Sequence, residues 1–149
     1  MIYSASGTIA VAATKTPLIL GSTAAIRPRI LAYDVYTDGT PTSDQGIVWQ
    51  IQRATALGTS TAYTPTPTDP SDPASVFTAG VNATIEPTYT AAQVLYKRAT
   101  NPRASWQWAA YDQRSEIIMP AVASNGVGFQ IQTAGGAAGN FGVNATLLE

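Results

Sequence analysis

Alternation of apolar and polar residues with a period of two dominates this sequence. Near the N-terminus Tyr3, Ala5 and Ile9 fall on one parity, and Ser4 and Ser6 fall on the other. A β-strand places successive side chains on opposite faces, so this pattern predicts a strand with one face in a core. Further segments with this alternation, or rich in β-formers, are 15–20, 29–37, 46–54, 92–98, 105–110, 116–119, 127–132 and 141–147. We therefore predict about eight to ten strands.

Turn dipeptides separate these segments. They include Asp38-Gly39, Leu57-Gly58, Asn101-Pro102 and Asn125-Gly126, whose residues tolerate positive φ or end a strand. No window of the sequence has the periodicity of a strong amphipathic helix, which argues against βαβ units and a parallel sheet. The pattern predicts an all-β fold, an antiparallel sandwich or barrel.

The length of 149 residues is typical of one domain, and we predict a single domain over 1–149. The segment 64–79 breaks the strand pattern with Pro65, Pro67, Pro70 and Pro73. We interpret it as a Pro-rich crossover loop between two sheets.

The composition excludes several chemistries. The chain has no His and no Cys, which excludes Ser–His–Asp triads, Cys–His proteases and the usual zinc sites. It carries 8 Lys+Arg and 9 Asp+Glu, without a basic block, which argues against nucleic acid as a partner. The apolar runs are too short for a membrane span, so we expect no membrane partner.

Carboxylates are the side chains left for acid–base catalysis, and Glu86 and Glu116 are the best pair for a glycosidase. We favour ordinary roles for both, in turns or ion pairs, and predict that the chain is not an enzyme. The loop with Asp38, Thr40, Ser43 and Asp44 could offer oxygen ligands to Ca²⁺, but it lacks regular acidic spacing and we interpret it as a turn. We predict no metal and no cofactor.

The three tryptophans allow two interpretations. Trp106 and Trp108 share one strand face, and Trp49 lies on another strand. Exposed, they would form a sugar-stacking platform; buried, they would fill the space between two sheets. We favour the core interpretation.

The order of these features resembles a known family. Lys15–Leu20 is followed by the 27–37 strand and its Asp38-Gly39-Thr40 turn, then by Val48–Arg53. Asp69-Pro70-Ser71-Asp72-Pro73-Ala74, Glu86-Pro87-Thr88, the aromatic strand with Trp106 and Trp108, and 116–120 come next. In this order and texture the chain resembles the small jelly-roll-like decoration, or cement, proteins of tailed bacteriophage capsids.

The resemblance implies an antiparallel β-sandwich of jelly-roll type and a viral structural role. Such a protein binds the major capsid protein and stabilises the assembled shell, as a homo-oligomer for which a trimer is favoured. Its location would be the outer capsid surface of the virion, assembled in the bacterial host cytoplasm. The alternative is a carbohydrate-binding or receptor-recognition β-sandwich module on a virion or cell surface.

Candidate contact residues are those that interrupt the strand pattern, at the chain ends, at the basic pair and in the Pro-rich loop. They are Ile2, Tyr3, Arg27, Arg29, Pro70, Asp72 and Phe77. A thinly charged exterior, with 11% charged residues, suits such contacts because neutral surface is cheap to desolvate.

Overall fold

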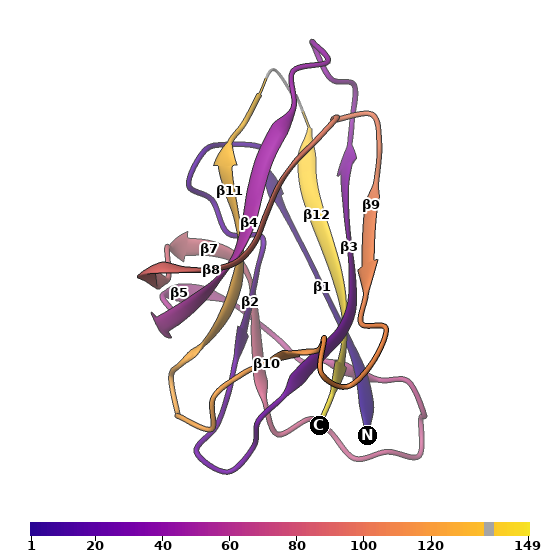
Figure 1. Ribbon diagram of the computed structural model, residues 1–149, viewed down its shortest axis with the longest axis vertical. Coiled ribbons are helices and arrows are strands. Elements are labelled where there is room, and N and C mark those ends of the chain that lie inside the picture. The colour runs from indigo at the N-terminus through magenta and orange to yellow at the C-terminus, as the bar shows by residue number, and fades with distance from the viewer. Residues whose placement is uncertain (136–138) are drawn as a thin grey trace.

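A computed structural model describes residues 1–135 and 139–149, and these residues form two packed antiparallel sheets (Figure 1). Sheet A has the order β10-β3-β12-β1-β6, with β9 also pairing with β3, and sheet B has the order β5-β7-β2-β11-β4-β8. The described residues contain no helix. The prediction of an all-β antiparallel β-sandwich is confirmed.

The described chain contains more strands than the predicted eight to ten. The strands are β1 (Ile2–Ala10), β2 (Leu18–Gly21), β3 (Arg29–Asp38), β4 (Ile47–Ala56), β5 (Thr59–Tyr63), β6 (Thr66–Pro67), β7 (Thr78–Ile85), β8 (Thr88–Thr100), β9 (Trp106–Ala109), β10 (Ile117–Ile118), β11 (Gly126–Thr133) and β12 (Asn140–Leu148). No helix in the described residues is long and apolar enough to cross a membrane.

Eight of the strands pair in a nested order. β1 pairs with β12, β2 with β11, β3 with β9, and β4 with β8. Each of these pairs joins a strand of the first half of the chain to a strand of the second half. Because Ile2 of β1 lies opposite Leu148 of β12, both ends of the chain lie side by side at one end of the sandwich (Figure 1).

The core lies between the sheets and follows the predicted parity. In β1 every second residue is buried, beginning at Tyr3, while Ser4, Ser6 and Thr8 are exposed. In β4 Trp49 and Ile51 are completely buried. Other fully buried large side chains come from both sheets and from the residue after β10: Leu18, Leu20, Ile30, Ile47, Phe129, Ile131, Phe141, Leu147 and Met119.

An aromatic cluster crosses the core and closes one edge of the sandwich. Tyr33 of β3 packs edge-on against Trp49 of β4, with ring centroids 5.9 Å apart, and stacks on Trp108 of β9 at 5.2 Å. At the margin, the guanidinium of Arg98 on β8 lies 3.3 Å from the ring centroid of Trp106 on β9. The core interpretation holds for Trp49, and Trp106 and Trp108 are partly buried against that core.

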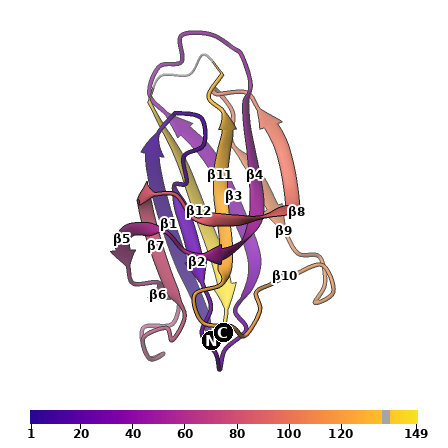
Figure 2. The ribbon, with the colours of Figure 1, turned by 90° about the vertical axis from the view of Figure 1, so that its left-hand side faces the viewer.

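The segment between β4 and β8 closes the opposite edge. β7 pairs with β2 in sheet B, and the short strand β6 pairs with Tyr3 and Ser4 of β1 in sheet A. The Pro-rich chain thus leaves sheet B after β5, touches sheet A at β6 and returns to sheet B at β7 (Figures 1 and 2). We did not predict β5, β6 and β7, because Thr59–Tyr63 lacks apolar alternation and Thr78–Ile85 is interrupted by Asn82 at positive φ.

A second layer covers the outer face of sheet B. The first part of β8 crosses this face (Figure 2), and the Tyr89 ring lies where a side chain at Gly128 would be. Leu57 occupies the space over Gly21 and Gly126 in the same way. A Cβ at Gly21 or Gly128 would displace the covering side chain, and a Cβ at Gly126 would also overlap the Leu20 carbonyl.

Buried polar side chains tie this layer to the sheet. Gln50 bonds to Gln52, whose amide donates to the Thr90 carbonyl at 2.8 Å. The hydroxyls of Thr16 and Tyr89 share a hydrogen bond of 2.8 Å, and Thr16 is completely buried. The layer therefore depends on paired polar groups as well as on apolar contact.

We predict that Tyr89→Phe destabilises the fold by about 1–2 kcal/mol, because it leaves the buried Thr16 hydroxyl without its partner. Urea denaturation followed by tryptophan fluorescence measures this loss. Tyr111→Phe is the matched control, since Tyr111 is 89% exposed and its change should leave the midpoint unmoved. Equal midpoints for the two variants would show that the Thr16–Tyr89 bond does not hold the layer.

Stability should also fall at alkaline pH. Burial raises the pKa of Tyr33 and of Tyr89 above the ordinary value of about 10. A raised pKa in the folded state means that the fold accommodates the neutral phenol better than the phenolate. The contribution of the neutral phenols to the free energy of unfolding is therefore complete below pH ~10 and is lost as the pH rises further. Thermal melts between neutral pH and pH ~11 should show a decline that begins near pH ~10 and is smaller in Tyr89→Phe. A decline of unchanged size in that variant would contradict the assignment.

Candidate interaction surface

The structure does not bring the candidate catalytic carboxylates together. Glu86 faces Lys15, with 3.8 Å between carboxylate and ammonium, and Glu116 accepts from Arg29 at 2.9 Å. Each carboxylate therefore lies in an ion pair with a cation of its own.

The predicted turn at 38–44 holds its acids with protein partners. Asp38 accepts from the Asn140 backbone N–H at 2.8 Å, and Asp44 accepts from Arg103 Nε at 2.6 Å. Within the described residues no group of three or more acidic side chains could hold a metal ion. The acidic side chains of this loop therefore connect it to neighbouring segments of the chain.

One end of the sandwich gathers most of the predicted contact segments. Thr68 donates from its backbone N–H to the Ile2 carbonyl at 2.9 Å, and the Val76 N–H donates to the Glu149 carboxylate at 3.1 Å. Arg29 at the start of β3 pairs with Leu148 near the end of β12. Figure 1 shows the Pro-rich loop and the loop before β3 at the same end as the two chain ends.

This end exposes apolar side chains. Ile2 is 39% exposed and Val76 is 56% exposed, next to the half-exposed Met1. Val122 is also exposed, and its backbone carbonyl accepts a hydrogen bond from the Ser22 hydroxyl. It therefore borders the segment that leads to Arg27. We call this the terminal surface and define it by Met1, Ile2, Arg27, Pro70, Asp72, Val76 and Val122.

Tyr3 and Phe77 are core residues, so our placing of them among the contact residues was wrong. Tyr3 is completely buried and Phe77 is 2% exposed. Their rings pack edge-to-face with centroids 5.6 Å apart, and the Tyr3 hydroxyl donates to the Pro73 carbonyl at 3.0 Å. The two side chains hold the Pro-rich loop on the sandwich and do not reach a partner.

The remaining loop candidates stay on the surface. Pro70 is exposed and Asp72 is half-buried. Asp69 fixes the loop here, because its carboxylate accepts from the Ser71 N–H at 2.9 Å and its carbonyl accepts from the Asp72 N–H at 3.0 Å. Pro70 therefore projects on a tightly turned segment, which lowers the entropy lost when a partner orders it.

The two predicted arginines have different roles. Arg29 is neutralised by Glu116, whose side chain is only 7% exposed. Arg27 is exposed, and no ion pair within 1–135 and 139–149 includes it. Arg27 instead lines a hollow of about 420 Å³ with Arg53, Thr90, Gln93 and Asn125. Arg53 is held there by its hydrogen bond of 3.0 Å to the Ile118 carbonyl.

Sequence reasoning missed Arg53 because it lies within the β4 pattern, where an isolated cation reads as an ordinary solvent-facing residue. Only the fold places it beside β10, where it donates to the Ile118 carbonyl. We call the hollow between Arg27 and Arg53 the arginine pocket. Two guanidinium groups with neighbouring amides suit a carboxylate from a partner.

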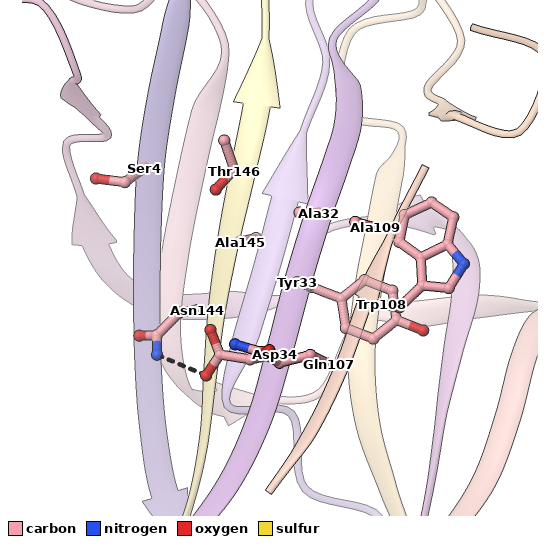
Figure 3. A pocket seen from close by; sticks show the side chains of 10 residues that line it. All are labelled: Ser4, Ala32, Tyr33, Asp34, Gln107, Trp108, Ala109, Asn144, Ala145 and Thr146. Carbon is pink, nitrogen blue, oxygen red and sulfur yellow. Dashed lines mark hydrogen bonds between the residues drawn. The ribbon is translucent and has the colours of Figure 1, made fainter. Parts of the chain in front are cut away.

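A second hollow lies on the outer face of sheet A and was not predicted. Its volume is about 520 Å³, and its polar lining includes Asp34 of β3, Asn144 of β12 and Gln107 of β9 (Figure 3). These residues come from three separate strands, so only the register of the sheet places them together.

No family model, curated protein or solved structure matches this chain.

We expect Arg29→Ala to lower stability by about 1–3 kcal/mol, because it leaves the Glu116 carboxylate without its charged partner in a shielded position. Arg27→Ala should melt like the wild type, since no ion pair depends on it. Differential scanning calorimetry of the two variants compares them directly. A larger loss in Arg27→Ala than in Arg29→Ala would reverse the roles assigned to the two side chains.

Proposed function

We propose that this chain is a viral structural protein, a capsid decoration or cement protein that binds the major capsid protein and stabilises the assembled shell. The observation that carries the proposal is the terminal surface. There exposed Ile2 and Val76 lie on the same end of the sandwich as Arg27, beside loops fixed by hydrogen bonds. Apolar side chains with an arginine at the margin are typical of protein contact surfaces.

The strand order supports the jelly-roll part of the proposal. β1 pairs with β12, β2 with β11, β3 with β9, and β4 with β8. This nested order is expected when one long hairpin is wound into two sheets. Jelly rolls are double sheets of eight strands built in this manner and are common in viral capsid proteins. The insertion β5–β7 and the strand β10 are then additions to that frame.

The arginine pocket indicates the chemistry of the partner. We propose that an acidic side chain of the capsid protein enters between Arg27 and Arg53, while an apolar segment covers Ile2 and Val76. The protein would act as a homotrimer on the outer surface of the virion, assembled in the host cytoplasm. Many copies that each stabilise only the assembled shell shift the equilibrium toward the assembled state.

Virus particles from the source of this sequence test the proposal. An antibody raised against the purified chain should detect a 15.5 kDa band that sediments with intact capsids at a fixed ratio to the shell protein. The purified protein should have three times the chain mass by light scattering. A band absent from particles would overturn the proposed function, and a monomer at high concentration would overturn the trimer.

Variants of the terminal surface should then lose binding to shells that lack the protein. We expect Val76→Asp and Arg27→Glu each to weaken co-sedimentation with such shells at least about tenfold, a loss of about 1.4 kcal/mol. Ile85→Asp is the matched control, because Ile85 is 63% exposed but lies at the end of β7, outside the terminal surface. Equal losses in Ile85→Asp and Val76→Asp would contradict a contact through the terminal surface.

A further inference from the structure

The outer face of sheet A carries a row of small side chains. Ser4 of β1 lies opposite Thr146 of β12, which lies opposite Ala32 of β3, and Ala32 lies opposite Ala109 of β9. Directly paired residues point to the same face of a sheet, so the four short side chains lie side by side. Because these side chains are short, they form the floor of the 520 Å³ hollow across four strands. We call it the sheet A hollow.

A polar row borders this floor. Along the same strands, Ser6, Asn144, Asp34 and Gln107 are the next set of paired residues on the outer face. Asn144 Nδ2 donates to Asp34 Oδ2 at 2.9 Å. Figure 3 shows Asn144 and Gln107 extending toward Asp34 from either side. The carboxylate has about four lone-pair sites, and this bond takes one of them.

An aromatic ring follows on the same face. Tyr36 is two residues after Asp34 in β3 and lies opposite Gly142. Its ring covers the outward side of Gly142, where an added Cβ would overlap the ring atoms. The absence of a side chain at Gly142 therefore allows the Tyr36 ring to pack against the sheet. The half-buried ring forms an apolar step beside the polar row.

We propose that the sheet A hollow binds a neutral sugar unit of a glycan. Sugar hydroxyls would pair with Asp34, Asn144 and Gln107, which offer acceptors and donors at fixed positions, while the sugar ring lies over the small side chains of the floor. Asp34 is the one charged side chain among the residues that line the hollow, so an anionic ligand would meet repulsion there. The volume is in the range of small-ligand sites.

This site is independent of the capsid contact. None of the residues that line the hollow belongs to the terminal surface. A protein seated by its terminal surface would keep the outer face of sheet A available for a glycan. Trp108 and Tyr33 also line the hollow (Figure 3), and their rings stack on each other.

The test is a titration of the purified wild-type protein with glucose, galactose, mannose, N-acetylglucosamine and their oligosaccharides, followed by amide NMR. At least one sugar should shift the signals of Asp34, Gln107 and Asn144 in a saturable manner. A panel on which no sugar shifts these signals would overturn the proposal. Capsid co-sedimentation of the same protein is a separate readout, so failure of one function is distinguishable from failure of the other.

Variants decide whether the sugar occupies the hollow. Asp34→Asn removes the charged acceptor, and Ala109→Trp fills the floor while keeping every polar group; each should weaken sugar binding at least about tenfold. Asp112→Asn, at an exposed loop position, is the matched control for the lost charge and should bind like the wild type. Sugar binding unchanged in both Asp34→Asn and Ala109→Trp, with native spectra, would overturn the site.

Discussion

The contact between Tyr33 and Trp49 joins the two sheets at the centre of the molecule, and the rest of the structure is arranged around it. Tyr33 comes from sheet A and Trp49 from sheet B, and Phe129, Tyr96 and Trp108 pack on the same pair. Aromatic side chains bury a large area and favour edge-on geometry, so this cluster fixes the spacing of the sheets. The edges are then closed by different means, with Arg98 over Trp106 on one side and the β5–β7 insertion on the other.

Much of the sandwich could be predicted from period-two alternation, because burial of one face imposes that period on each strand. The parity of Tyr3, Ala5 and Ile9, and that of Trp49 and Ile51, appears unchanged in the structure. The insertion could not be predicted in this way. β5 has no fully buried residue, and β7 is shaped by Asn82 at positive φ and by the close approach of Ser60 to Gly80.

The candidate sites show where local sequence information ends. Tyr3 lies near the chain end and Phe77 lies in the Pro-rich segment, yet both side chains fill the core and hold that segment on the sandwich. Arg27 and Arg29 are two residues apart, but only the fold gives Arg29 the Glu116 carboxylate and gives Arg27 the neighbouring Arg53. The row of Asp34, Asn144 and Gln107 depends on strand register, which no single segment contains.

The structure thus presents two separate surfaces on one rigid frame: the terminal surface, with apolar side chains and an arginine pocket, and the polar outer face of sheet A. The central claim is that the terminal surface seats the protein on a capsid. Cryo-electron microscopy of intact particles tests it most directly. The account predicts density for trimeric sandwiches on the outer shell, with Val76 and the loops at 22–28 and 68–76 against the shell protein. Sandwiches attached through the outer face of sheet A or through the outer face of sheet B, or shells without them, would contradict it.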